Sequence, residues 1–180
     1  TKFASEVTHE GTPIKGGTLK YALVSASPFK GLFMDELASD STDSSITSQI
    51  DTTLFEYDEN RKLTNTGLGS IEFDVEGKTA TVKLNSKDFK WSDGQPFTIY
   101  DYIFAIEAIG NKDYTGSRYN DRYTNIVGMK DFHEGKSDKI SGVEKVDDYT
   151  VKLHFEKMLP SMQLAGGAIP AYTMPKHIFK

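Results

Sequence analysis

The stretch from residue 82 to residue 101, VKLNSKDFKWSDGQPFTIYD, connects a predicted strand to a predicted helix. Its Ser92-Asp93-Gly94 segment is typical of a tight turn, and Pro96 restricts the backbone shortly before the next element. Thr98 and Asp101 have the spacing of a capping box, in which each side chain accepts a hydrogen bond from the other residue's backbone amide. We therefore expect a strand, an ordered turn and a capped helix in succession.

Behind this cap, large apolar residues recur with the period of an α-helix. The stripe consists of Ile99, Tyr102, Ile103, Ile106 and Ile109. Gly110 then stands where the C-terminal stop of a helix belongs. The spacing predicts an amphipathic helix that ends near Gly110.

Strand patterns flank this helix on both sides. Before it, residues 71–75 and 80–84 alternate apolar and polar side chains around the turn Glu76-Gly77-Lys78, which predicts an antiparallel hairpin. After it, residues 149–155 alternate in the same way, and we expect residues 143–146 to pair with them. Helices mixed with hairpins predict an α+β (mixed α/β) fold.

The N-terminal part of the chain predicts fewer elements. Residues 1–16 are small and polar and indicate a flexible leader. Residues 18–24, TLKYALV, predict a buried strand, and the loop Ser25-Ala26-Ser27-Pro28 that closes it is of the kind that often carries ligands. From Ser44 onward, four apolar residues have helical spacing: Ile46, Ile50, Leu54 and Phe55. They predict a helix of about 10–12 residues.

Composition excludes several classes of function. The 180 residues include 21 Lys and Arg against 26 Asp and Glu, a net charge of −5 that argues against nucleic acid or an anionic membrane surface as partner. No apolar run approaches the roughly 18 residues that span a bilayer. The lack of cysteine excludes thiolate chemistry, and the 4 histidines are too scattered to predict a metal site.

Two groups of residues could carry chemistry. Asp93 and Asp101 are candidates for the paired carboxylates of a hydrolase, although a turn and the first turn of a helix favour structural roles for them. Tyr114, Tyr119 and Tyr123 lie among arginine and asparagine residues. This composition suits recognition of peptides or sugars, and it is also common in solvated loops.

The segment Lys90-Trp91-Ser92-Asp93-Gly94-Gln95-Pro96-Phe97-Thr98, followed by Asp101, resembles the signature of a family of bacterial extracellular solute-binding proteins. That family includes the oligopeptide-, dipeptide- and nickel-binding components of ABC transporters. Gly16–Lys20, Leu54–Asp58 and Met174–Phe179 resemble further landmarks of the family in the same order. Ser27–Gly31 and Gly110–Gly116 look most like oligopeptide-binding members from lactic acid bacteria and streptococci.

The resemblance implies a fold as well as a function. Family members are much longer than this chain and have the periplasmic-binding-protein-like class II fold, in which two lobes close over the ligand. On this basis residues 17–44 form the first strand and ligand-side loop of lobe I, and residues 45–159 form an inserted α/β subdomain. Residues 160–180 begin the return to lobe I, and the rest of lobe I and all of lobe II are absent from the chain.

The resemblance also implies ligand contacts, which fall on Tyr119, Asp43, Ser44, Ser45 and Ser27. The expected partners are an oligopeptide ligand and an ABC permease, with no enzyme activity and no cofactor. We expect a monomer at the extracellular face of the cell membrane, held by a lipid anchor that is not in this chain.

Alternatives remain open at this point. Relatives of the same fold bind nickel, haem or sugar, and a surface peptide sensor or adhesin could keep the fold without importing. A hydrolase that uses Asp93 and Asp101 is the remaining alternative.

Overall fold

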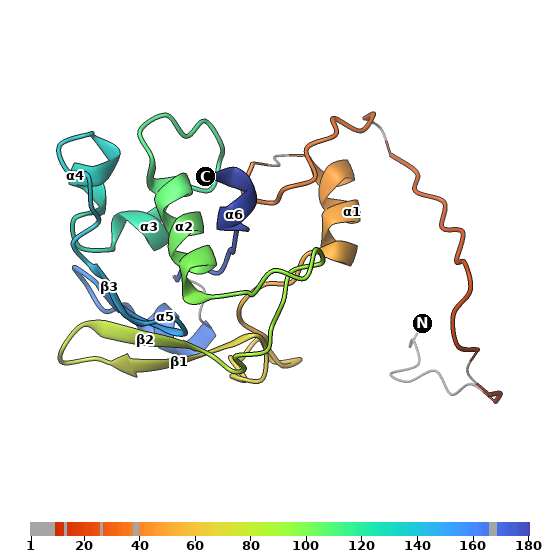
Figure 1. The fold of residues 1–180 in the computed structure, drawn as a ribbon, viewed down its shortest axis with the longest axis horizontal. Helices are drawn as coiled ribbons and strands as arrows, with labels where there is room; N and C mark the ends of the chain where they lie inside the picture. Colours follow the sequence, from red (N-terminus) through yellow and green to blue (C-terminus); the bar gives the residue numbers. More distant parts are fainter. Residues whose placement is uncertain (1–9, 13, 26, 38–39, 166–168) are drawn as a thin grey trace.

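The structure, a computed structural model, describes residues 10–12, 14–25, 27–37, 40–165 and 169–180. Its centre is a four-stranded antiparallel sheet in the order β1-β2-β4-β3 (Figure 1). The strands are β1 (Gly69–Asp74), β2 (Thr79–Leu84), β3 (Val143–Asp147) and β4 (Thr150–His154). The helices are α1 (Ser41–Ile50), α2 (Ile99–Gly110), α3 (Asp121–Thr124), α4 (Met129–His133), α5 (Pro160–Ala165) and α6 (Lys176–Phe179).

The two predicted hairpins are confirmed, and they meet in the middle of the sheet. In β1 and β2, Ile71 pairs with Val82, and Val82 pairs in turn with Val151 of β4. Alternate residues of β2 and β4 are buried, so the period of two in the sequence places one face of the sheet against the core. The sequence therefore predicts the sheet's buried face correctly.

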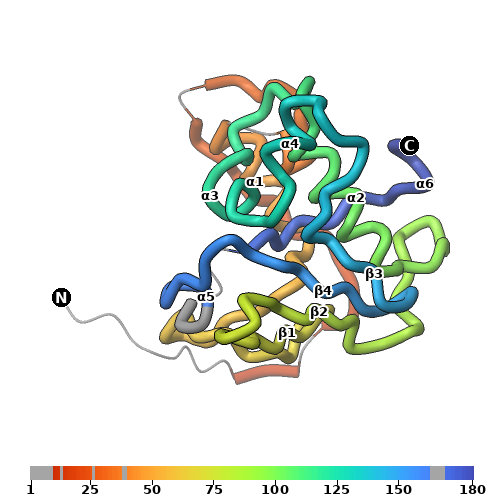
Figure 2. The backbone as a smooth tube through the Cα atoms, turned by 90° about the vertical axis from the view of Figure 1, so that its left-hand side faces the viewer, coloured from red at the N-terminus to blue at the C-terminus, as the bar shows by residue number. Residues whose placement is uncertain are grey.

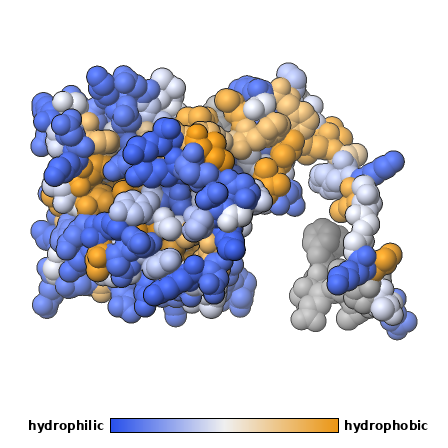
Figure 3. All heavy atoms as spheres, viewed as in Figure 1, coloured by the Kyte–Doolittle hydropathy of each residue, from blue (hydrophilic) through white to orange (hydrophobic). Residues whose placement is uncertain are grey.

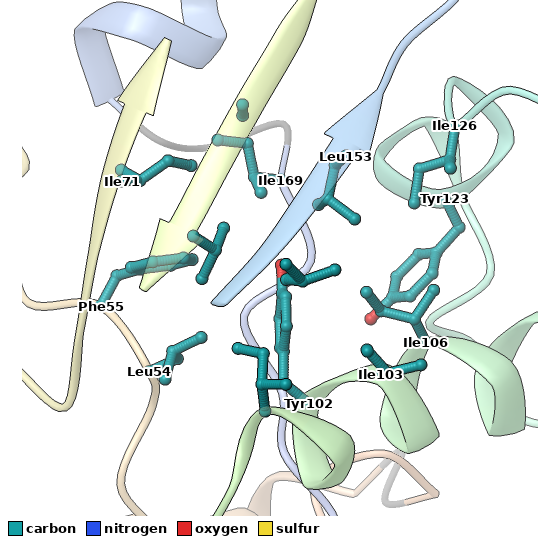
Figure 4. Close-up of a cluster of buried hydrophobic side chains, with 14 of the residues drawn as sticks. Leu54, Phe55, Ile71, Tyr102, Ile103, Ile106, Tyr123, Ile126, Leu153 and Ile169 are labelled. Atoms are coloured by element: carbon teal, nitrogen blue, oxygen red, sulfur yellow. The ribbon is translucent and has the colours of Figure 1, made fainter. Parts of the chain in front are cut away.

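Helix α2 covers this buried face. Figure 4 shows side chains of the strands and of α2, including Tyr102 and Ile106, pointing toward one another in the core. The Tyr102 hydroxyl donates a hydrogen bond of 2.8 Å to the Pro170 carbonyl, so this buried polar group is satisfied. At the far end of α2, a Cβ on Gly110 would lie 2.6 Å from the Met129 sulfur, so any larger residue here would have to displace the Met129 side chain of α4.

The turn before α2 forms as predicted. The Gly94 amide donates to the Trp91 carbonyl at 2.9 Å, and Gly94 has a φ of 87°, a conformation that favours glycine. Trp91 packs on Phe97, with ring centroids 5.2 Å apart, and contacts the main core. The capping box of Thr98 and Asp101 is present.

Asp101 does more than cap α2. Its carboxylate, 4% exposed, accepts hydrogen bonds from Trp91 Nε1 at 3.2 Å, from the Thr98 amide at 2.9 Å and from the Lys176 amide at 3.0 Å. Its carbonyl also accepts a bond from the Met174 amide at 3.0 Å. The segment leading to α6 is thereby fixed to the start of α2, and Figure 2 shows it crossing between the sheet and the upper helices.

Helix α1 has the expected length of 10 residues but a different position. It begins at Ser41, because the Asp40 side chain caps it by accepting a bond from the Thr42 amide. It ends at Ile50, so the prediction that Leu54 and Phe55 belong to this helix is wrong, although both are core residues. The buried side of α1 is polar, and Ile50 is 68% exposed.

The predicted buried strand over residues 18–24 is wrong. These residues are outside regular structure, with Leu19 at 90% and Val24 at 97% exposure. Backbone groups of a strand need a neighbouring strand, and none of the described strands pairs with this segment. Most of the predicted leader, residues 1–9 and 13, lies outside the described residues. None of the helices in the described part of the chain is long and apolar enough to cross a membrane.

The first testable consequence concerns Asp101. Replacing Asp101 with alanine should lower the free energy of unfolding of this chain by about 3 kcal/mol, because three partly buried donors lose their charged acceptor. Urea unfolding followed by circular dichroism measures the change. Asp88→Ala, at an exposed aspartate, is the control and should stay within about 0.5 kcal/mol. Equal unfolding midpoints for the two variants would contradict the role assigned to Asp101.

Candidate ligand-binding site

Asp43 holds the loop that precedes α1. Its side chain is fully buried, and its two oxygens accept hydrogen bonds from the Lys30 and Leu32 amides, both at 3.0 Å. Because both oxygens are occupied, Asp43 positions the loop in this structure. Its role as a ligand contact stays a prediction.

The predicted serines lie around the N-terminal half of α1. Ser27 is exposed, and its hydroxyl lies 3.3 Å from that of Thr42, beside Asp43 on the helix. Ser45 is exposed and donates to the Ser41 carbonyl at 2.8 Å, whereas Ser44 is half-buried. The structure thus brings Ser27 to α1, and it leaves Ser27 and Ser45 accessible to a ligand.

Tyr119 lies on another part of the molecule, between α2 and α4. It is half-buried and stacks on His133, with ring centroids 3.9 Å apart and an interplanar angle of 17°. The His133 Nδ1 is 3.0 Å from the Gly110 carbonyl, which can only accept, so Nδ1 carries the proton. Burial raises the pKa of Tyr119, with a smaller contribution from the charge of Glu134. His133 is not predicted from the sequence as part of this site, because only the fold brings it to Tyr119.

The tyrosine-rich segment also contacts the loop before α1 directly. The Tyr114 hydroxyl donates to the Glu36 carbonyl, and Arg118 Nε donates to the Asp35 carbonyl at 2.9 Å. The Arg118 guanidinium also lies 5.4 Å from the ring centre of Tyr172. These contacts join three segments that are far apart in sequence.

A hollow of about 720 Å³ opens beside this junction. Its walls are mostly apolar and aromatic, and three carboxylates also line it. We call it the acidic hollow and define it by Phe33, Asp35, Glu36, Asp51, Trp91 and Tyr172. Figure 3 shows hydrophobic atoms gathering where the segment before α1 meets the body of the molecule.

The carboxylates of the acidic hollow affect one another. Glu36 is 7% exposed, and burial, reinforced by the charges of Asp51 and Asp35, raises its pKa to about 7. Burial and the charge of Asp35 also raise the pKa of Asp51. Arg118 acts in the opposite direction on Glu36. Asp35 is itself held by Thr47, whose hydroxyl donates to Asp35 Oδ1 at 2.6 Å.

The two aspartates considered for a hydrolase each have structural partners. Asp93 Oδ2 lies 2.7 Å from His177 Nε2, and the Gln95 amide and His177 together lower the pKa of Asp93. Asp101 accepts the bonds that fix α2 to the segment before α6. In the part of the chain that the structure describes, no three histidine, aspartate or glutamate residues are placed to hold a metal ion.

Comparisons with known proteins identify the family of this chain. The family described as "Bacterial extracellular solute-binding proteins, family 5 Middle" matches residues 69–179. The oligopeptide-binding protein OppA of Lactococcus lactis subsp. cremoris (strain SK11) is 39% identical over 147 residues, 79% of this chain and 24% of that protein. The chain therefore spans about a quarter of the length of this relative.

The fold of this chain is also similar to solved structures of oligopeptide-binding proteins. Lactococcal OppA, complexed with an endogenous peptide in the closed conformation, matches with a TM-score of 0.78 at 34% identity, over 86% of this chain and 30% of that one. Haemophilus influenzae OppA in complex with RPPGFSPFR matches with a TM-score of 0.63 at 28% identity, over 81% of this chain and 29% of that one. The similarity extends through most of the present chain.

The raised pKa of Glu36 predicts a pH-dependent stability. A buried acid with a raised pKa binds its proton more tightly in the folded state, so stability falls as pH rises from 4.5 to about 7. The unfolding free energy of both proteins is compared at pH 5 and pH 8. From the lower to the higher pH it should fall by about 2–3 kcal/mol more in the unchanged chain than in Glu36→Gln, which has no acid to titrate at this position. Urea unfolding at both pH values measures the difference.

The matched control for this prediction is Glu72→Gln, which makes the same chemical change at an exposed site on β1. The unchanged chain and Glu36→Gln share the other titratable groups near this site, so the titration of these groups cancels when the two proteins are compared. These groups are Asp35, Asp51, Arg118 and Tyr114. A Glu36→Gln profile parallel to that of the unchanged chain would contradict the burial of an ionisable Glu36.

Proposed function

Because this chain belongs to the bacterial extracellular solute-binding proteins of family 5, we propose that it is the N-terminal portion of an oligopeptide-binding protein. The complete protein would capture extracellular peptides and deliver them to the membrane permease of an ABC importer. The observation that carries this proposal is the similarity, over most of the chain, to lactococcal OppA complexed with an endogenous peptide.

Within this proposal, the chain divides into parts with different tasks. Residues 17–44 belong to lobe I and present the ligand-side loop, residues 45–159 form an inserted subdomain, and residues 160–180 return toward lobe I. The hydrogen bonds from Met174 and Lys176 to Asp101 support this division, since they fix the returning segment to the subdomain. Those from Tyr114 and Arg118 fix the loop to it as well.

Peptide capture of this kind relies on the backbone of the ligand. Extended peptides bind through main-chain hydrogen bonds, and hydrated pockets accept varied side chains. Ser27, Ser44, Ser45 and Tyr119 would supply polar contacts, and Asp43 would hold the loop in place. Closure of two lobes over the peptide would then produce the form that a permease distinguishes.

The location of the complete protein and its ligand class are also part of this proposal. We place the complete protein at the extracellular face of the membrane as a lipid-anchored monomer. A nickel, haem or sugar ligand would use the same fold, but the relative with 39% identity is an oligopeptide-binding protein. The hydrolase alternative is not favoured, because Asp101 is engaged in structural hydrogen bonds.

The proposal is tested by calorimetric titration of mixed peptides, about 4–10 residues long as extended capture requires, into this chain and into the complete protein that contains it. We expect binding by the complete protein and none by this chain alone, because the ligand needs both lobes. Binding by neither protein would refute peptide capture.

Tyr119 supplies a prediction about the site within the same protein. Tyr119→Phe keeps the ring stacked on His133 but removes the hydroxyl, so peptide affinity should fall about five-fold, the effect of one hydrogen bond. The control is Tyr100→Phe, at an exposed tyrosine in the first turn of α2. Equal affinities of the two variants for the mixed peptides would remove Tyr119 from the site.

A further inference from the structure

Among the described residues, no hydrogen bond engages the hydroxyl of Tyr119. The Tyr119 side chain is half-buried, and in the same part of the chain the Tyr123 hydroxyl is the only side-chain polar atom that is both buried and unpartnered. The Tyr119 hydroxyl is therefore accessible from solvent, as a ligand contact requires. Such a contact is strongest when its ring is already held in one orientation, because ordering a side chain on binding costs free energy.

The backbone on both sides of Tyr119 is fixed by hydrogen bonds. Before it, the Arg118 amide donates to the Tyr114 hydroxyl at 3.2 Å. After it, the Asn120 side chain caps α3 by accepting a bond from the Arg122 amide at 3.1 Å. These bonds set the path of the chain through Tyr119, but they do not constrain its ring.

The ring of Tyr119 is held by His133. The two rings lie face to face, with centroids 3.9 Å apart and an angle of 17° between their planes. Stacked aromatic rings attract each other, so this contact favours one rotamer of Tyr119 over the others. The imidazole thus supplies the constraint on the ring that the backbone does not.

His133 is itself fixed by the C-terminal end of α2. Its Nδ1 donates to the carbonyl of Gly110, the last residue of that helix, at 3.0 Å. Helix α4, which ends at His133, packs against the same place, where a Cβ on Gly110 would lie 2.6 Å from the Met129 sulfur and 3.4 Å from Phe132 Cδ1. One edge of the imidazole is therefore bound to α2, and one of its faces is left for Tyr119.

We propose that His133 is a positioning residue of the peptide site, whose imidazole holds the Tyr119 ring in the orientation in which its hydroxyl meets the peptide. This inference rests on the proposed function, because it assigns a task within the site that the complete protein would use. Tyr119 makes the contact with the peptide, and His133 acts through it. Because the ring is ordered before the peptide arrives, binding does not bear the cost of ordering it.

The test separates the ring of His133 from its hydrogen bond in the complete protein. His133→Asn keeps a donor near the Gly110 carbonyl but removes the ring. Its affinity for the mixed peptides, measured by calorimetry, should fall about four-fold, most of the effect of one hydrogen bond, whereas its midpoint of urea unfolding should stay the same.

His133→Phe makes the opposite change, since it keeps a flat ring beside Tyr119 but loses the donor to Gly110. Its affinity should stay within about 1.5-fold of the unchanged protein, and its unfolding midpoint should fall, because a buried carbonyl loses its partner. An equal loss of affinity in both variants, or a loss in neither, would refute the inference and leave peptide capture standing.

A double-mutant cycle tests whether the effect of His133 passes through Tyr119. In Tyr119→Phe the contact that His133 positions is already lost, so adding His133→Asn should change affinity by less than about 1.5-fold. His154→Asn, at a half-buried histidine of β4, is the matched control and should bind as the unchanged protein does. The same loss with and without the Tyr119 hydroxyl would refute the inference. If the unchanged complete protein binds none of the mixed peptides, peptide capture fails and this inference fails with it.

Discussion

The hydrogen bonds to the buried carboxylate of Asp101 hold the segments of this chain in their positions relative to one another. It receives Trp91 Nε1 from the turn, the Thr98 amide from the cap of α2, and the Lys176 amide from the start of α6. Three segments thus share one charged acceptor, and each bond to it is stronger than a bond between neutral groups. The hydrogen bond from Tyr102 to the Pro170 carbonyl then extends the connection into the core beneath the sheet.

The loop before α1 is fixed to the rest of the molecule in a comparable way. Asp43 accepts the loop amides of Lys30 and Leu32, and further along the loop the carbonyls of Asp35 and Glu36 accept donors from Arg118 and Tyr114. All four of these bonds end on backbone groups of the loop. The loop's path is therefore set by distant side chains, and the acidic hollow lies where that path meets the segment that contains Tyr172.

Patterns within a few consecutive residues correctly predicted several helices, strands and caps. The alternation around Val82, the stripe of α2 and the Thr98–Asp101 cap each lie within a few residues, and each is present in the structure. The predictions of secondary structure are wrong where the conformation of a segment depends on residues or strands that contact it. Residues 18–24 have the composition of a strand but no described strand beside them, and α1 begins at Ser41 because Asp40 caps it. The stacking of His133 on Tyr119 and the acidic hollow depend on tertiary contacts, so neither can be predicted from residue spacing.

Three carboxylates are buried in the described part of the chain, and their surroundings differ. Asp101 has three donors and Asp43 has two, and both hold backbone segments in place. Glu36 has burial similar to that of Asp101, but it lines a hollow together with two further acids, Asp35 and Asp51, whose charges raise its pKa. A structural role explains the first two, because their bonds offset the cost of burial. For Glu36 the cost of burial is met instead by a pKa raised to about 7, which keeps much of this side chain protonated and uncharged near neutral pH.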